Sequence, residues 1–211
     1  QPGNSEDWRQ APTEQLIAHI LSRFHARHRE QLPELIRLAS RVEQVHGERD
    51  NCPNGLADHL RDMQQELESH MLKEEQILFP VLLDGLGARA AAPISVMRME
   101  HDQHGEALQR ILDLTANITP PSNACNTWRA LYRGLDELRN DLMQHIHLEN
   151  NVLFANAHIQ HLAQLRGQRI GVENSALGAF FLSRILDLAK LPASEISVID
   201  MPVNEHLNAL R

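Results

Sequence analysis

The sequence has little of what a disulfide-stabilised, membrane-spanning or nucleic-acid-binding protein requires. It has two cysteines, Cys52 and Cys125, without Cys-x-x-Cys spacing, which argues against a disulfide framework and favours a reducing cytoplasm. No signal peptide is expected from the given sequence, and no segment of it approaches the roughly 20 apolar residues of a membrane helix. Lys and Arg number 20 against 28 Asp and Glu, and they are scattered, so nucleic acid is not an expected partner.

Aromatic residues are also scarce, whereas histidine is abundant. Phe, Trp and Tyr together make up 4 % of the chain, while 13 of the 211 residues are histidines. This imbalance favours metal binding over the stacking of ligands or bases on aromatic rings.

Two pairs of near-identical motifs contain many of these histidines. The pattern H-x-x-x-E-x-x-[IV]-L-F occurs at residues 70–79 and 145–154, and H-x-x-H-x-E-x-L occurs at 25–32 and 101–108. The offset between the two motifs is 70 − 25 = 45 residues in the first half and 145 − 101 = 44 in the second. A duplicated helical hairpin, each half giving one lone His and one His/Glu pair, explains this pattern.

The spacing within the motifs predicts a metal site with two ions. Residues four apart lie on one face of a helix, so one helix can direct an imidazole and a carboxylate at the same ion. The predicted ligands are His25, His70, Glu74, His101, His145 and Glu149. Six side chains exceed a tetrahedral zinc site but suit two ions that take two histidines each and share both carboxylates. Iron, oxo- or hydroxo-bridged, is the first choice; manganese and zinc remain alternatives.

Other residues of the motifs have weaker predicted roles. Glu66, Asp141 and Glu100 are candidates to hydrogen-bond the ligand histidines from a second layer. His28 and His104 repeat as well, but their i+3 spacing predicts partly exposed or second-layer positions. Four further repeated residues are expected only to pack in the core: Leu78, Phe79, Leu153 and Phe154.

The apolar spacing predicts an all-α protein, an antiparallel up-down-up-down four-helix bundle with a short βαβ-like C-terminal extension. Helices are expected over residues 13–46, 55–86, 94–117 and 123–157. In terms of domains, residues 1–12 form a tether, 13–162 the bundle and 163–211 a βαβ-like appendage, an incomplete foreign fragment.

The motifs resemble those of a known family, the hemerythrin-like di-iron proteins of the Repair of Iron Centres type. The similarity runs from about Asp7 to Phe154 and includes His28-Arg-Glu-Gln-Leu-Pro-Glu-Leu35 and Ser69-His-Met-Leu-Lys-Glu-Glu-Gln-Ile-Leu-Phe-Pro80. The family's iron ligands fall on the six residues already selected by spacing. The resemblance implies a cytoplasmic stress-response protein that restores damaged iron-sulfur clusters by supplying iron or handling nitric oxide.

The sequence departs from this family at both ends. The family usually has a small N-terminal domain with a cysteine pair, which this sequence does not include. The segment from Leu165 to Leu210 resembles part of a periplasmic substrate-binding protein for nitrate, sulfonate or taurine, through Arg169-Ile-Gly-Val-Glu173 and Asp200-Met-Pro-Val-Asn-Glu-His206.

Three other functions are compatible with the same residues. One is a hemerythrin-like carrier or sensor of oxygen or nitric oxide, and another is a di-iron oxidase or nitric oxide reductase. The third is a metal-free interaction bundle. No Ser/His/Asp or Cys/His nucleophile is predicted, and the expected partners are damaged iron-sulfur proteins and small ligands such as nitric oxide or oxygen. The oligomeric state is left open.

Overall fold

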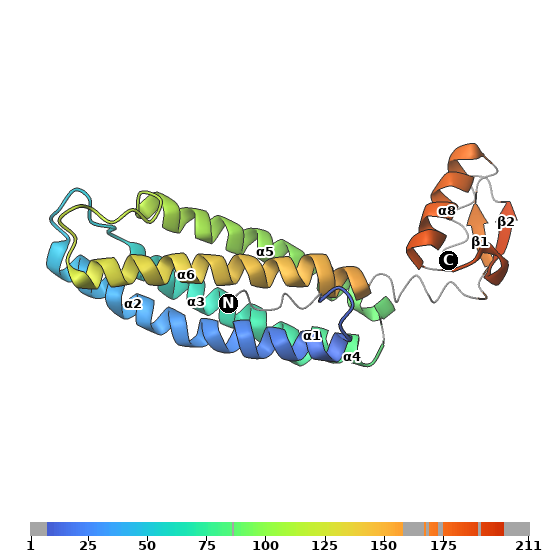
Figure 1. The fold of residues 1–211 in the computed structure, drawn as a ribbon, viewed down its shortest axis with the longest axis horizontal. Coiled ribbons are helices and arrows are strands. Elements are labelled where there is room, and N and C mark those ends of the chain that lie inside the picture. Colours follow the sequence, from blue (N-terminus) through green and yellow to red (C-terminus); the bar gives the residue numbers. More distant parts are fainter. Residues whose placement is uncertain are drawn as a thin grey trace, which may run out of the picture.

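The computed structural model describes residues 8–85, 87–157, 167, 169–172, 175–189 and 191–200. Most of this part of the chain is helical (Figure 1). The helices of its first 157 residues are α1 (Thr13–Ile20), α2 (Ala26–His46), α3 (Leu56–Lys73), α4 (Phe79–Leu83), α5 (Gly87–Leu114) and α6 (Asn126–Leu148).

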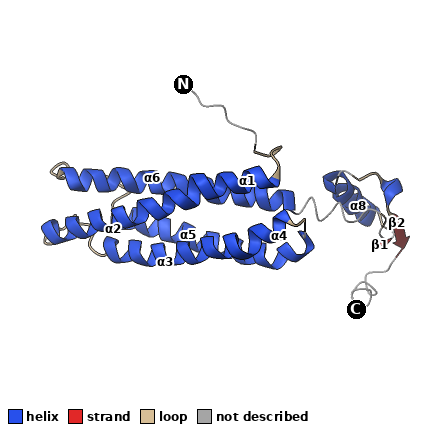
Figure 2. Ribbon diagram, turned by 90° about the horizontal axis from the view of Figure 1, so that it is seen from below, coloured by secondary structure: helices blue, strands red, loops and turns tan. Residues whose placement is uncertain are grey.

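These helices form four long rods that run side by side, as Figures 1 and 2 both show. The first rod consists of α1 and α2, the second of α3 and α4, and α5 and α6 form the other two. Helix α2 packs against α3 and α6, and α5 packs against the same two helices. Thus α2 and α5 occupy diagonal corners of the bundle. The predicted hemerythrin-like four-helix bundle is confirmed.

The apolar faces of the rods form two core clusters along the bundle. The longer cluster contains Leu35, Leu60, Leu67 and Trp128, and the other, near α1 and α4, contains Phe24 and many further buried side chains. Each fully buried large side chain stabilises the fold by about 1.5–3 kcal/mol. The two clusters therefore offset the free-energy cost of burying the polar side chains that lie between them.

One glycine explains how α2 and α6 approach each other closely. A Cβ atom on Gly134 of α6 would lie 2.6 Å from Leu35 Cδ2 of α2. Any larger residue at this position would push the two helices apart or displace Leu35.

Four helix boundaries differ by three or more residues from those expected from the sequence. Two of them flank the loop between α5 and α6, where α5 ends at Leu114 rather than at residue 117 and α6 begins at Asn126 rather than at residue 123. The second rod ends at Leu83 rather than at residue 86, and α5 begins at Gly87 rather than at residue 94. Pro93 led to the prediction of a loop, but α5 continues through it. The preceding residues 90–92 are all alanines, the strongest helix formers, and proline removes only one backbone donor from the helix.

The C-terminal part contains the βαβ arrangement expected from the sequence. Strand β1 (Arg169–Val172) is followed by α8 (Ala176–Ala189), a 3₁₀ turn (Ala193–Glu195) and β2 (Ser197–Asp200). The two strands pair in parallel, with Arg169 opposite Ser197. Leu186 and Leu191 are buried there, and Leu182 and Ile196 pack against them.

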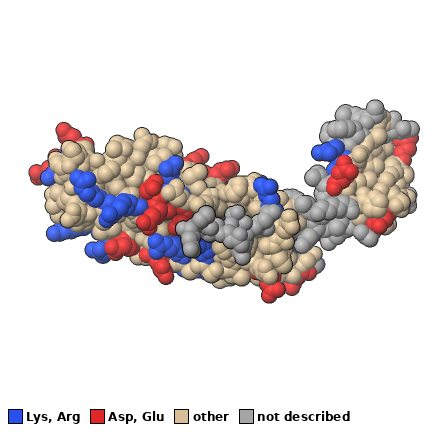
Figure 3. All heavy atoms as spheres, viewed as in Figure 1, with Lys and Arg blue, Asp and Glu red and all other residues tan. Residues whose placement is uncertain are grey.

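The surface of the bundle carries both signs of charge. On the face seen in Figure 3, basic and acidic side chains are interspersed over the bundle. Several basic side chains of the bundle form ion pairs with acidic ones. One such pair joins Arg29 to Glu68 at 2.9 Å, and another joins Arg27 to Glu137 at 3.3 Å. Within the described residues, no helix combines the length and apolar character needed to cross a membrane.

Several predictions lie partly or wholly outside the described residues. These are most of the tether at residues 1–12, the end of the bundle domain at 158–162 and the motif from Met201 to His206.

Candidate metal centre

The six predicted ligands come together inside the bundle, between the two apolar clusters. All four rods contribute: His25 follows α1, His70 and Glu74 lie at the end of α3, His101 lies on α5, and His145 and Glu149 lie at the end of α6. Every one of these side chains is at most 3 % exposed. The chain thus places a buried polar layer across its hydrophobic core.

Three π-helical segments coincide with three of these residues. The segment Leu21–His25 ends on one ligand candidate, and the segments Glu74–Leu78 and Glu149–Leu153 each begin with another. A π turn inserts an extra residue into a helix and is often found at functional sites, because it changes the direction of nearby side chains. The backbone is therefore adapted locally on three of the four rods.

The six side chains form two groups that could each hold one metal ion. One group is His25, Glu74, His145 and Glu149, and the other is His70, Glu74, His101 and Glu149. Within each group, one ligand atom from every residue lies within 4.8 Å of the others. Both carboxylates belong to both groups, as the sequence hypothesis of two ions with shared carboxylates requires.

The two oxygens of each carboxylate face different groups. Glu74 Oε2 lies 3.3 Å from His25 Nε2, and its Oε1 lies 3.4 Å from His70 Nε2. Likewise, Glu149 Oε1 lies 3.2 Å from His145 Nε2, and its Oε2 lies 3.1 Å from His101 Nε2. This is the arrangement in which a carboxylate can bridge two ions, one at each oxygen.

The donor set also fits metal ions electrostatically. None of the four carboxylate oxygens has a hydrogen-bond partner among the described residues, although the imidazoles lie close by. Burial and the neighbouring Glu149 raise the pKa of Glu74 well above its usual value. Burial opposes ionisation of Glu149 too, but His145 and His101 hold its pKa well below the usual value. Two buried carboxylates side by side need positive charge, which metal ions would supply.

Two of the predicted ligand histidines, His25 and His70, are suited to bind metal because they are neutral at pH 7. Burial and, to a smaller extent, the neighbouring His145 lower the pKa of His25 to about 4. Burial likewise lowers the pKa of His70 to about 4. A neutral imidazole has a free lone pair for a metal ion.

Three hydrogen bonds fix which nitrogen offers this lone pair. Nδ1 of His25 lies 2.8 Å from Glu75 Oε1, and Nδ1 of His70 lies 2.9 Å from Glu100 Oε2. Nδ1 of His101 lies 3.1 Å from Asn150 Oδ1. If each Nδ1–H donates to its oxygen, Nε2 is left unprotonated and faces the carboxylate cluster.

The fourth ligand histidine, His145, has a different environment. Its Nδ1 is buried without a hydrogen-bond partner in the described part of the chain, and Phe24 stacks on its ring with centroids 5.2 Å apart. Phe24 precedes His25 just as Glu100 precedes His101, so the repeat has an acid in one half and an aromatic ring in the other. The two halves of the centre are therefore not equivalent.

Of the three acids predicted to support the ligands, Glu100 contacts one. Asp141 instead binds Arg23 at 2.6 Å and Gln31 at 2.9 Å, and Glu66 is exposed on α3. Glu75 and Asn150 were missed. Each directly follows a ligand glutamate in the repeated motif, and this shared position was the signal available in the sequence.

Further repeated residues also lie against the centre. Phe79 stacks on His25 at 5.8 Å, and Phe154 stacks on His101 at 5.9 Å, so these rings contact the ligands in addition to packing in the core. His28 and His104, expected to be partly exposed or in a second layer, are fully buried beside the ligands. The apolar side chains packed around the two rings keep His28 and His104 away from solvent.

The cysteines lie away from this centre. Cys52 and Cys125 are both free, as expected. The Sγ atom of Cys125 lies 3.3 Å from His46 Nε2 in an exposed contact that the sequence did not indicate. His46 and His25 are separated by roughly 30 Å of helix, at about 1.5 Å per residue.

A substitution at Glu75 tests the role of the hydrogen bonds around the ligands. Glu75→Leu is expected to weaken iron binding by roughly 10- to 100-fold, because His25 loses the acceptor that orients it. Competition with a chelator measures this change. The neighbouring exposed residue provides a control, Gln76→Leu, which should leave the affinity unchanged. Equal affinities in both variants would contradict a role for Glu75.

The rods and the site define the class of protein. Four helical rods that enclose four imidazoles and two shared carboxylates make a hemerythrin-like, metal-binding bundle. Residues 16–157 match the family model described as the hemerythrin HHE cation binding domain. The chain belongs to this hemerythrin family.

Within curated proteins, the chain is similar to iron-sulfur cluster repair proteins named YtfE. The protein from Yersinia pseudotuberculosis serotype IB (strain PB1/+) is 57 % identical over 157 residues, which cover 74 % of this chain and 71 % of the relative. The protein from Pectobacterium carotovorum subsp. carotovorum (strain PC1) is 56 % identical over the same coverage. The resemblance drawn from the motifs is confirmed.

Proposed function

We propose that this protein holds two non-haem iron ions and restores iron-sulfur clusters that nitrosative or oxidative stress has damaged. The observation that carries the proposal is the pair of ligand groups that share Glu74 and Glu149. The names of its relatives, iron-sulfur cluster repair proteins, support the choice of activity. His25 and His145 would hold one ion, and His70 and His101 would hold the other.

Ligand chemistry supports iron over other metals. Mixed imidazole and carboxylate ligands with open positions suit non-haem iron. Two ferrous ions bring four positive charges, against the two negative charges of Glu74 and Glu149, so the loaded centre is cationic. The ions would supply an exchangeable iron or a binding position for nitric oxide or oxygen.

The residues of the chain contribute the environment of this centre. The six ligands are buried between Phe24, Phe79 and Phe154 on one side and the longer apolar cluster on the other, which keeps bulk water away. The hydrogen bonds to Glu75, Glu100 and Asn150 orient three imidazoles. We propose the cytoplasm as the location and damaged iron-sulfur proteins as the partners.

Recovery of a damaged cluster tests the activity. A dehydratase whose cluster has been damaged by nitric oxide should regain activity when the iron-loaded protein is added, and the metal-free protein should restore little. Glu149→Gln is the matched variant, because it keeps the size of the side chain and removes the shared charge. If a fully iron-loaded protein gave no recovery but bound nitric oxide reversibly, the carrier or sensor function would replace repair.

A further inference from the structure

Two buried histidines that serve neither as ligands nor as their hydrogen-bond partners lie beside the proposed centre. His28 is 0 % exposed and His104 is 2 % exposed. Among the described residues, no group is in hydrogen-bonding geometry with Nδ1 or Nε2 of either ring. Burying a polar group without a partner costs free energy and is uncommon in folded proteins. Four such atoms, two on each side of the proposed centre, therefore suggest that a ligand uses them.

Neither ring is satisfied by the polar side chain next to it. Gln31, one turn beyond His28, donates to Asp141 at 2.9 Å. The Gln31 amide does not reach hydrogen-bonding geometry with the His28 ring, and its own Oε1 also lacks a partner among the described residues. A neutral imidazole offers one N–H donor and one lone pair.

The two histidines occupy equivalent positions in the duplicated structure. His28 lies on α2 and His104 on α5, the diagonal helices, each three residues beyond a ligand histidine. The ring of His28 lies 5.3 Å from that of His145, and the ring of His104 lies 4.9 Å from that of His70. His145 and His70 belong to different ligand groups. Each candidate ion therefore has one additional imidazole near it.

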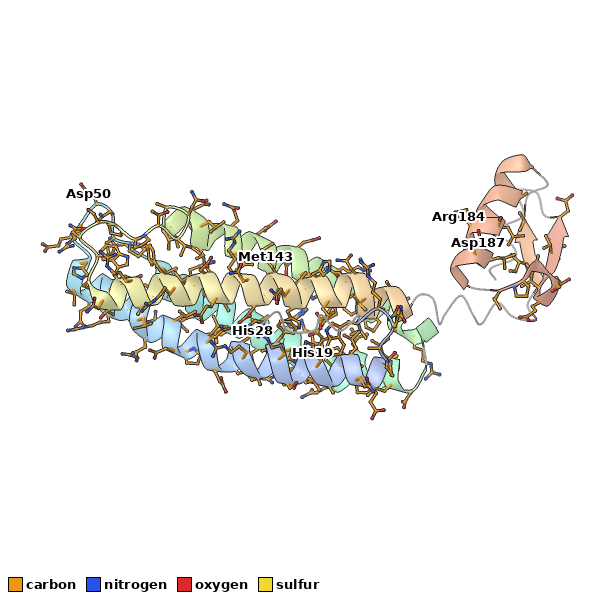
Figure 4. The ribbon with its side chains drawn as sticks, in the orientation of Figure 1. His19, His28, Asp50, Met143, Arg184 and Asp187 are labelled. Atoms are coloured by element: carbon orange, nitrogen blue, oxygen red, sulfur yellow. The ribbon has the colours of Figure 1, made fainter. Side chains whose placement is uncertain are left out.

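The rings of His28 and His104 also form the polar side of the proposed centre. Phe24, Phe79 and Phe154 stack on ligand rings and belong to the apolar cluster near α1 and α4. His28 of α2 and His104 of α5 lie one turn towards the longer cluster, and Figure 4 marks the place of His28 along α2. Of these five side chains, only His28 and His104 can donate a hydrogen bond to a polar ligand at the ions.

Surface grooves lie over both histidines, although the imidazoles themselves are buried. His28 lines a groove of about 760 Å³ between α2 and α3, together with Leu32 and Met71. His104 lines a smaller groove of about 290 Å³ between α3 and α5. A small molecule in either groove would lie against the side chains that cover one of these two imidazoles.

We propose that His28 and His104 together bind the small exogenous ligand of the centre, a molecule of two or three atoms that accepts hydrogen bonds. Each ring donates one N–H to this ligand. The chemistry is that of nitric oxide, oxygen or a small anion such as azide. This assignment rests on the proposed dinuclear centre, and it gives the histidines a role in ligand binding and none in holding the ions.

Azide binding to the iron-loaded, oxidised protein tests this assignment. Titration followed by the ligand-to-metal absorption band gives the dissociation constant. His28→Phe and His104→Phe are each expected to raise it about tenfold, the effect of losing one hydrogen bond, and the double variant about 100-fold. His28→Gln, which keeps a donor, should stay within roughly threefold of the wild type.

Two controls separate ligand binding from loss of structure. His147→Phe removes an exposed imidazole from α6 and should leave azide binding unchanged. All variants should retain two irons per chain. The metal-free double variant should also melt at a higher temperature than the wild type, because it no longer buries unpartnered polar atoms.

The possible outcomes distinguish this assignment from the proposed function. An unchanged azide affinity in either single variant, or loss of iron from it, would overturn the role of these histidines. Azide binding that depends on both rings, together with no recovery of damaged clusters, would support the role and reject the repair activity. A wild-type protein that takes up no iron would reject both.

Discussion

Glu149→Gln is expected to lower the bound iron from about two ions per chain to well below one. The reason is geometric, because each oxygen of Glu149 faces a different histidine pair and so serves both ions. An amide keeps the shape but removes the negative charge that offsets the ions. Metal analysis after anaerobic reconstitution measures the effect, and circular dichroism shows whether the helices remain.

A histidine variant provides the contrast that makes this prediction specific. His145 belongs to one ligand group only, so His145→Ala is expected to lose about one ion and keep the other. The exposed acid Glu106 on α5 provides the control variant, Glu106→Gln, which should retain both ions. Equal iron losses in the Glu149 and His145 variants would contradict a bridging carboxylate, because they would mean that each residue serves the same number of ions.

The meeting of the six candidate ligands could be predicted from the sequence because it follows a simple rule of helix geometry. His70 and Glu74 are four residues apart and share a helix face, and the same spacing recurs at His145 and Glu149. The duplication then paired each set with a lone histidine. The structure brings all six together, and the family match is consistent with a cation site.

The hydrogen bonds around the ligands could not be predicted in the same way. Glu75 lies next to Glu74 and therefore on a different side of its helix, where it meets His25 of another rod. Such a contact depends on how α2 and α3 are packed and rotated, and the π-helical segment at Glu74 changes that rotation locally. Asp141, by contrast, has the expected spacing from His145 but meets Arg23.

The burial of His28 and His104 shows a further limit of sequence patterns. An i+3 position can be buried when helices approach on both sides, and α2 has neighbours in both α3 and α6. The start of α5 was misplaced for a different reason. Proline was given more weight than the run of alanines before Pro93, although it removes only one backbone hydrogen bond from a long helix.

The metal-free protein is expected to lose its stability steeply between pH 6.5 and about pH 4. Burial lowers the pKa of His25 and His70 to about 4 and that of His28 and His104 to about 3 in the folded protein, from 6.5 when exposed. Within this range the unfolded chain binds protons that the folded protein does not, so acid favours unfolding. Each histidine contributes about 1.4 kcal/mol per pH unit.

The net difference in protons bound by the unfolded and folded protein, summed over these groups, sets how steeply the stability falls with pH. The raised pKa of Glu74 acts in the opposite direction, since the folded protein there holds a proton that the unfolded chain releases. Four histidines against one such carboxyl group leave a net dependence of roughly 4 kcal/mol per pH unit. A domain with a stability of about 5–15 kcal/mol would therefore unfold within a few pH units.

Urea unfolding at a series of pH values measures this slope, and a variant with His28→Phe and His104→Phe should show about half the histidine contribution. A slope that is unchanged in this variant would show that His28 and His104 do not remain neutral in the folded protein.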